Sequence, residues 1–276
     1  MQLAMINGKI IPLTHVEPVF LDRGTFFGDG VYEVIRSYNG QIFALEQHLL
    51  RFSNSLDAIK IHNVDIDNIR RLVEEAFAAA GISNAKIYFH ITRGCALRNH
   101  TFDDNIKPNF FLTITELHDD TAQKEHGIAV STAPDLRWKR CNIKSLNLLP
   151  NVLARHDAEK KGCDEAIFVD GAGLITEGAS SAFFAILAGE LHTAPLTANI
   201  LPSVTRAFVI KAAKDINLPL VEESLTINQA AAADELFIAV TTKGIIPVVK
   251  FDGHDIAGAK PGKFTQMLID QFRSFT

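Results

Sequence analysis

Lys144 is the first residue whose surroundings suggest chemistry. It stands in the segment CNIKSLNLLP, between Ile143 and a run rich in leucine. Burial disfavours the charged form of an amine and lowers its pKa, and a neutral amine can form a Schiff base with a carbonyl compound. A surface lysine whose aliphatic stem covers apolar neighbours fits the same segment. Taken alone, Lys144 is therefore either a nucleophile or a solvated side chain.

Glu177 lies between two apolar, strand-like segments in the sequence LITEGASSAFF. A carboxylate in such a place can keep a pyridinium nitrogen protonated, which makes the ring an electron sink. Because small residues follow directly, a solvated carboxylate in a turn is the alternative.

A third group of residues has the types that bind phosphate. Residues 203–206 follow Pro202 and open a helical pattern, and the free amides at a helix start bind phosphate readily. Thr241 and Thr242 end a strand-like run and offer hydroxyl donors, while Arg51 in EQHLLRF offers a guanidinium. Each also fits an ordinary role as a helix cap, a strand end or a solvated arginine.

Arg98 and His100 follow a predicted strand that ends in ITRG. Two residues apart in an extended loop, they point the same way and can face one carboxylate. Tyr32, in GDGVYEV, can add a phenol donor. A solvated loop is the alternative. Trp138, the single tryptophan, packs either in the core or as a wall over a substrate.

The composition excludes several classes of protein. With 27 Lys and Arg against 32 Asp and Glu, the 276-residue chain has a net charge of −5, which argues against a general nucleic-acid binder. We expect no membrane span, because no run of about 18 apolar residues occurs, and no secretory signal. Three cysteines without metal-ligand spacing favour a reducing cytoplasm and no metal site. The Rossmann, P-loop, zinc-protease and nucleophile-elbow motifs do not occur.

Hydrophobic periodicity and turn residues predict a mixed α/β chain of two domains. The smaller, residues 1–117, is predicted to contain hairpins at Asn7-Gly8 and Asn39-Gly40, a helix over 69–80, and strands around 30–38, 87–91 and 110–114. A polar linker is predicted over 118–124. The larger domain, residues 125–276, is predicted to be rich in short strands, with helices over 151–161, 205–216 and 263–274.

Seven segments, taken in order, resemble the fold-type IV (class IV) pyridoxal-phosphate aminotransferases. They run from about residue 22 to residue 248: RGTFFGDGVYEVIR, EQHLLRF, ITRG, IKSLNLLPNVLA, ITEGASSAFF, LPSVTR and TTKGIIPVV. Within that family, Tyr32 and the Arg98-x-His100 pair resemble the bacterial D-amino acid transaminases. The resemblance implies two α/β domains with pyridoxal 5′-phosphate at their interface, in a homodimer with shared active sites.

The resemblance also implies a role for each candidate residue. Lys144 forms the Schiff base with the cofactor and catalyses proton transfer, and Glu177 partners the ring nitrogen. The substrates implied are a D-amino acid similar to D-alanine and a 2-oxo acid such as 2-oxoglutarate. The remaining cofactor contacts are Arg51, Leu201, Val204, Thr205 and Thr241, and the substrate contacts are Tyr32, Arg98, His100, Trp138 and Thr242, with Arg98 and His100 donated by the neighbouring subunit.

The sequence departs from its relatives in two places. Pro202 and Ser203 stand where a basic residue and a glycine are usual, and Lys243 with Gly244 replaces a Ser-Glu-like pair. The second change leaves side-chain preference open. Three other functions stay open as well: an L-branched-chain aminotransferase, an aminodeoxychorismate lyase, and a cofactor-binding protein without catalysis.

Overall fold

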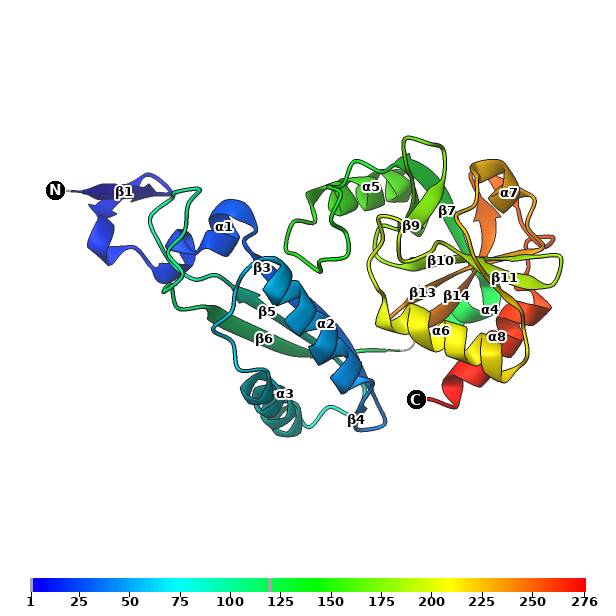
Figure 1. Ribbon diagram of the computed structural model, residues 1–276, viewed down its shortest axis with the longest axis horizontal. Helices are drawn as coiled ribbons and strands as arrows, with labels where there is room; N and C mark the ends of the chain where they lie inside the picture. The colour runs from blue at the N-terminus through cyan, green and yellow to red at the C-terminus, as the bar shows by residue number, and fades with distance from the viewer. Residues whose placement is uncertain (1, 119–120) are drawn as a thin grey trace.

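The computed structural model describes residues 2–118 and 121–276, so residues 119 and 120 of the predicted linker lie outside the described part (Figure 1). The chain begins with the predicted hairpin, formed by β1 (Leu3–Ile6) and β2 (Lys9–Pro12). Asn7 and Gly8 join the two strands with positive φ angles of 50° and 83°, which these residue types tolerate best. Three short helical segments follow: η1 (Leu13–His15), η2 (Pro18–Leu21) and α1 (Arg23–Phe27).

A four-stranded antiparallel sheet comes next, in the order β4-β3-β5-β6. Its strands confirm the predicted positions: β3 (Gly30–Tyr38), β4 (Gln41–Ile42), β5 (Ala85–Thr92) and β6 (Asn109–Glu116). Helices α2 (Leu45–Ala58) and α3 (Ile66–Ala80) cover one face, and Gly81 ends α3 as its pattern predicts. Alternate residues of a strand face opposite sides, so Val31 and Ile35 join the core under these helices while Tyr32 faces the other way.

The second sheet has nine strands, and all of them come after residue 127. The order is β12-β11-β10-β13-β14-β7-β8-β9, with β15 beside β14, and the pairing is mixed parallel and antiparallel. The strands are β7 (Ile128–Pro134), β8 (Glu165–Val169), β9 (Ile175–Gly178), β10 (Ala182–Leu187), β11 (Glu190–Thr193), β12 (Leu220–Glu222), β13 (Glu235–Val240), β14 (Gly244–Phe251) and β15 (His254–Asp255).

Helices pack on both faces of this sheet. On one face, α6 (Val204–Asp215) and α8 (Lys263–Arg273) enclose Phe184, Phe237 and Leu268, and α7 (Ile227–Ala231) lies against the core of the other face. Helices α5 (Leu149–Lys160), α6 and α8 confirm the three predicted helices, with ends shifted by at most two residues, whereas α7 was not predicted. The segment 121–124 of the predicted linker belongs to α4 (Thr121–His126). Within the described residues, no helix is both long and apolar enough to cross a membrane.

Candidate active site

A cavity of about 640 Å³ lies between the two sheets and is lined by both. The N-terminal sheet and its helices contribute Tyr32, Val34, Arg51 and Lys86, and the rest of the lining comes from the C-terminal part. Eight of the predicted site residues meet here: Tyr32, Arg51, Trp138, Lys144, Glu177, Leu201, Thr241 and Thr242. The topology therefore brings together residues more than 200 positions apart in the sequence.

Lys144 lies half-buried on the segment between β7 and α5. Its backbone is tied to the N-terminal part, because its amide donates to Ser55 Oγ (3.2 Å) and its carbonyl accepts from the amide of Tyr32 (3.0 Å). Its Nζ donates to Tyr32 Oη at 3.3 Å and lies 4.4 Å from the centre of that ring. The amine thus faces the cavity beside a phenol, which is a suitable place for a nucleophile or a general base.

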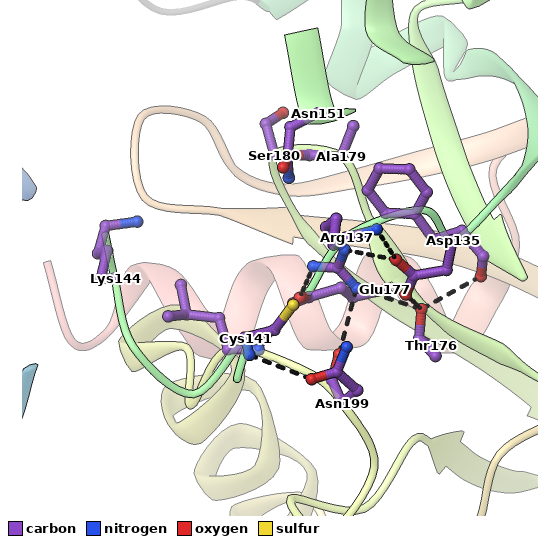
Figure 2. A network of polar contacts seen from close by, with 12 residues as sticks. Asp135, Arg137, Cys141, Lys144, Asn151, Thr176, Glu177, Ala179, Ser180 and Asn199 are labelled. Atoms are coloured by element: carbon purple, nitrogen blue, oxygen red, sulfur yellow. Dashed lines mark hydrogen bonds and ion pairs between the residues drawn. The ribbon is translucent and has the colours of Figure 1, made fainter. Parts of the chain in front are cut away.

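Glu177 is buried at the end of β9, with 6% of its surface exposed. The alternative of a solvated turn carboxylate is therefore wrong. The carboxylate accepts hydrogen bonds from the amide of Leu201 (3.1 and 3.2 Å) and from Nη1 of Arg137 (Figure 2). Arg137 also donates from Nε and Nη2 to Asp135, at 2.9 and 2.7 Å. One guanidinium is shared between two carboxylates.

The pKa of the Glu177 carboxyl is raised although Arg137 donates to it. Burial raises the pKa of Glu177 to about 7, although Arg137 and the Leu201 amide both act in the opposite direction. For Asp135, burial is outweighed by Arg137, which lowers the pKa of the Asp135 carboxyl. Arg137 was not predicted from the sequence, because nothing in LRWKR distinguishes it from Arg140 two residues beyond Trp138.

Anion-binding groups gather at the start of α6. Ser203 caps this 12-residue helix by accepting from the amide of Arg206 (3.1 Å), and Val204 and Thr205 form its first turn. The hydroxyls of Thr205 and Thr241 lie 3.3 Å apart, and Arg51 Nη1 donates to the carbonyl of Pro202 (3.2 Å). First-turn amides have no partner inside a helix, so amides, hydroxyls and a guanidinium meet here in the combination that binds phosphate.

Glu33 and His48 hold Arg51 in place. Arg51 donates to Glu33 through Nε (2.8 Å) and Nη2 (2.7 Å), and His48 Nδ1 lies 2.8 Å from the same carboxylate. Burial opposes ionisation of Glu33, but Arg51 and His48 together lower its pKa to about 2. Burial also lowers the pKa of His48. Glu33 was not predicted from the sequence, although a carboxylate on the inward face of an apolar strand is a signal for a buried partner.

Arg98 and His100 lie on an exposed loop after β5. Both contact the ring of Phe27, Arg98 with Cζ 5.1 Å from its centre and His100 with ring centres 5.5 Å apart. The structure brings these two residues together, but the described residues that line the cavity of this protomer do not include them. Trp138 lines the cavity with 42% of its surface exposed, so the interpretation as a core residue is wrong.

The cavity combines a lysine amine, a buried carboxylate and an anion site. These three groups suit a cofactor that carries a carbonyl, a ring nitrogen and a phosphate, respectively. The model of the family described as amino-transferase class IV matches residues 30–251. The chain belongs to this family of pyridoxal-phosphate-dependent aminotransferases, as its motifs predict.

Curated relatives match over the full length. The chain is 37% identical to a D-alanine aminotransferase of Staphylococcus haemolyticus, covering 100% of this chain and 98% of the relative. It is 34% identical to one of Bacillus licheniformis, covering 95% and 93%.

Among solved structures, the branched-chain amino acid aminotransferase of Escherichia coli is similar with a TM-score of 0.87 at 23% identity, over 97% of this chain and 92% of that one. A 4-amino-4-deoxychorismate lyase from Legionella pneumophila, described as putative, is similar with a TM-score of 0.84 at 21% identity, over 96% and 97%. The fold-type IV architecture is confirmed.

Proposed function

We propose that this chain transfers the amino group of a D-amino acid, D-alanine in particular, to a 2-oxo acid such as 2-oxoglutarate. The full-length similarity to D-alanine aminotransferases supports the choice of substrate. The observation that carries the reaction class is the Lys144 amine and the buried Glu177 carboxylate on one cavity, with an anion site at its end. We further propose that the enzyme is cytoplasmic and consists of domains 1–117 and 125–276 joined by the segment 118–124.

The residues of the cavity fit pyridoxal 5′-phosphate. Arg51, Val204, Thr205 and Thr241 would hold the phosphate, since they combine a guanidinium, first-turn amides and two hydroxyls. Leu201 would pack against the ring and Glu177 would face its nitrogen. When bound, the cofactor supplies a carbonyl carbon that joins to amines and a cationic ring that accepts electrons.

Lys144 has three tasks in this proposal. Its Nζ anchors the cofactor, removes the proton from Cα of the amino donor, and delivers a proton to the equivalent carbon of the 2-oxo acid in the second half of the reaction. The Tyr32 hydroxyl, 3.3 Å away, accepts a hydrogen bond from this amine and orients it. Ionised Glu177 keeps the ring nitrogen protonated.

Arg98 and His100, the residues proposed to bind the substrate carboxylate, do not line the cavity of their own protomer. Tyr32 lines it, whereas Arg98 and His100 are presented outward on their loop. We propose a homodimer in which Arg98 and His100 of a second copy reach the site that contains Tyr32. Trp138 and Thr242 would then contact the rest of the substrate from the cavity wall.

The experiment is to incubate purified holoenzyme with D-alanine or L-leucine, with and without 2-oxoglutarate. The cofactor absorbance and the chirality of the glutamate formed are followed. We expect the absorbance to change with D-alanine and D-glutamate to form, and Lys144→Ala to abolish multiple turnovers. Reaction with L-leucine alone would contradict the carboxylate site, and pyruvate release from aminodeoxychorismate without an amino acceptor would indicate a lyase.

A further inference from the structure

The loop that carries Arg98 and His100 is exposed, but a buried arginine side chain holds its backbone. Arg23, with only 3% of its surface exposed, donates from Nη1 to the carbonyl of Asn99 (2.6 Å) and to that of Thr101 (3.4 Å). Its Nη2 lies 3.5 Å from the carbonyl of His100. Exposed loops open locally at little free-energy cost, unless buried groups hold their backbone. Here three consecutive carbonyls face one buried guanidinium.

Asp29 in turn fixes Arg23. Its carboxylate accepts from Arg23 Nε (2.8 Å) and, through both oxygens, from Arg93 Nε (2.9 Å) and Nη2 (3.0 Å). Arg93 uses its other donors on the carbonyls of Ile59 (2.6 Å) and Lys60 (2.9 Å). Two buried arginines therefore share one carboxylate and also donate to backbone carbonyls, and a connected polar network of this kind is rigid.

Two aromatic rings connect this cluster to the exposed side chains. Arg93 Cζ lies 3.6 Å from the centre of the Phe102 ring, and Arg23 Cζ lies 4.8 Å from that of Phe27. Arg98 and His100 contact the same Phe27 ring from their side of the loop. The side chains of this pair and the backbone from Asn99 to Thr101 therefore contact Arg23 directly or through Phe27.

We propose that Arg23, Asp29 and Arg93 are positioning residues, which hold Arg98 and His100 in one geometry for binding the substrate carboxylate in the site of a neighbouring subunit. We name these three residues the clamp. The inference rests on the proposed function, because it assigns the clamp a role only through Arg98 and His100. A pair of cations ordered before binding loses less freedom when the anion arrives, so the clamp favours substrate affinity.

Arg23→Met in the holoenzyme is the direct test. Methionine fills the buried space and removes the donors to the loop, while Asp29 keeps its bidentate bond to Arg93. We expect KM for D-alanine to rise roughly tenfold to a hundredfold, with kcat at saturation within about twofold and an unchanged cofactor absorbance. Arg71→Met is the matched control, because it removes an arginine ion pair with Glu75 on the exposed face of α3.

A double-mutant cycle decides whether Arg23 acts through the pair. In an Arg98→Ala/His100→Ala background, Arg23→Met should raise KM by less than about twofold further, because the residues it positions are gone. The full additional increase in that background would overturn the proposal. If Arg98→Ala/His100→Ala raises KM but Arg23→Met does not, the clamp alone is wrong. If Arg98→Ala/His100→Ala leaves KM unchanged, the proposed carboxylate site is wrong as well.

A second variant covers the case in which Arg23→Met does not fold. Arg23→Lys keeps a charge beside Asp29 but loses the fork that reaches several carbonyls at once. The same rise in KM is expected, together with faster amide hydrogen exchange over residues 97–102. Unchanged exchange and unchanged KM would overturn the proposal.

Discussion

Two carboxylates buried beside arginines, Glu33 and Glu177, have opposite properties. Both are almost inaccessible to solvent, with 0% and 6% of their surface exposed. The pKa of Glu33 is lowered to about 2, whereas that of Glu177 is raised to about 7. Burial disfavours the ionised form of both carboxyls, so burial alone does not explain why their pKa values differ in opposite directions.

The number of hydrogen bonds from arginine explains it. Glu33 receives both Nε and Nη2 of Arg51 and has His48 as a further partner. Glu177 receives one group of Arg137, whose Nε and Nη2 are directed to Asp135 (Figure 2). Glu33 thus stays ionised at neutral pH and holds Arg51 in place. Glu177 receives fewer arginine donors, and a cationic ring nitrogen in the cavity would favour its ionised form.

The largest effect is expected from Glu33→Gln. This change leaves the guanidinium of Arg51 buried without its counter-ion, and removing one partner of a buried ion pair costs about 3–5 kcal/mol. The free energy of unfolding, measured by chemical denaturation, should fall by that amount. Cofactor affinity should fall with it, because Arg51 loses the group that orients it.

Glu75→Gln is the matched control for Glu33→Gln. It breaks the exposed ion pair with Arg71, which is worth less than about 1 kcal/mol. If the two substitutions destabilise the protein to the same extent, Glu33 is not the buried anion described here.

Glu177→Gln should lower turnover without destabilising the protein. A carboxamide carries no charge to hold the proton on the ring nitrogen, so kcat should fall roughly a hundredfold, the scale of one lost electrostatic contact in an active site. Stability at pH 7 should not fall, since Arg137 keeps Asp135 as a partner and glutamine places no charge in the buried site. Steady-state kinetics with D-alanine and thermal unfolding of the same preparations check both statements. Equal kcat in the two proteins would contradict the role of Glu177.

Glu177 and its partner Arg137 differ in how well the sequence predicts them. Lys144, Glu177 and the strands around them could be predicted, because ordered motifs and alternating polarity are local patterns. Arg137 could not, since its partner Glu177 becomes adjacent only when β9 folds against the segment after β7. Helix α2 has no start signal: it begins after Ala44, which has φ of 55° and makes no side-chain cap.

The smallest effect is a pH dependence in the cofactor-free protein. A carboxyl whose pKa is raised on folding contributes stability below its unfolded value of 4.5 and loses that contribution as pH rises through about 7. Wild type should therefore lose, relative to Glu177→Gln, on the order of 2 kcal/mol between these pH values. Glu33 has the opposite sign: its contribution is present above 4.5 and is lost as pH falls toward 2.

Asp135→Asn tests whether sharing of Arg137 sets this pH window. With Asp135 neutral, Arg137 is available to Glu177 alone, so the pKa of Glu177 should fall. The loss of stability above pH 4.5 should then be smaller and end at lower pH. Chemical denaturation of the cofactor-free variants across pH 4.5 to 8 measures the shift. A window that stays in place would mean that competition for one guanidinium does not distinguish Glu177 from Glu33. In that case the Asp135 carboxylate would not increase the affinity of the cavity for a cationic ring.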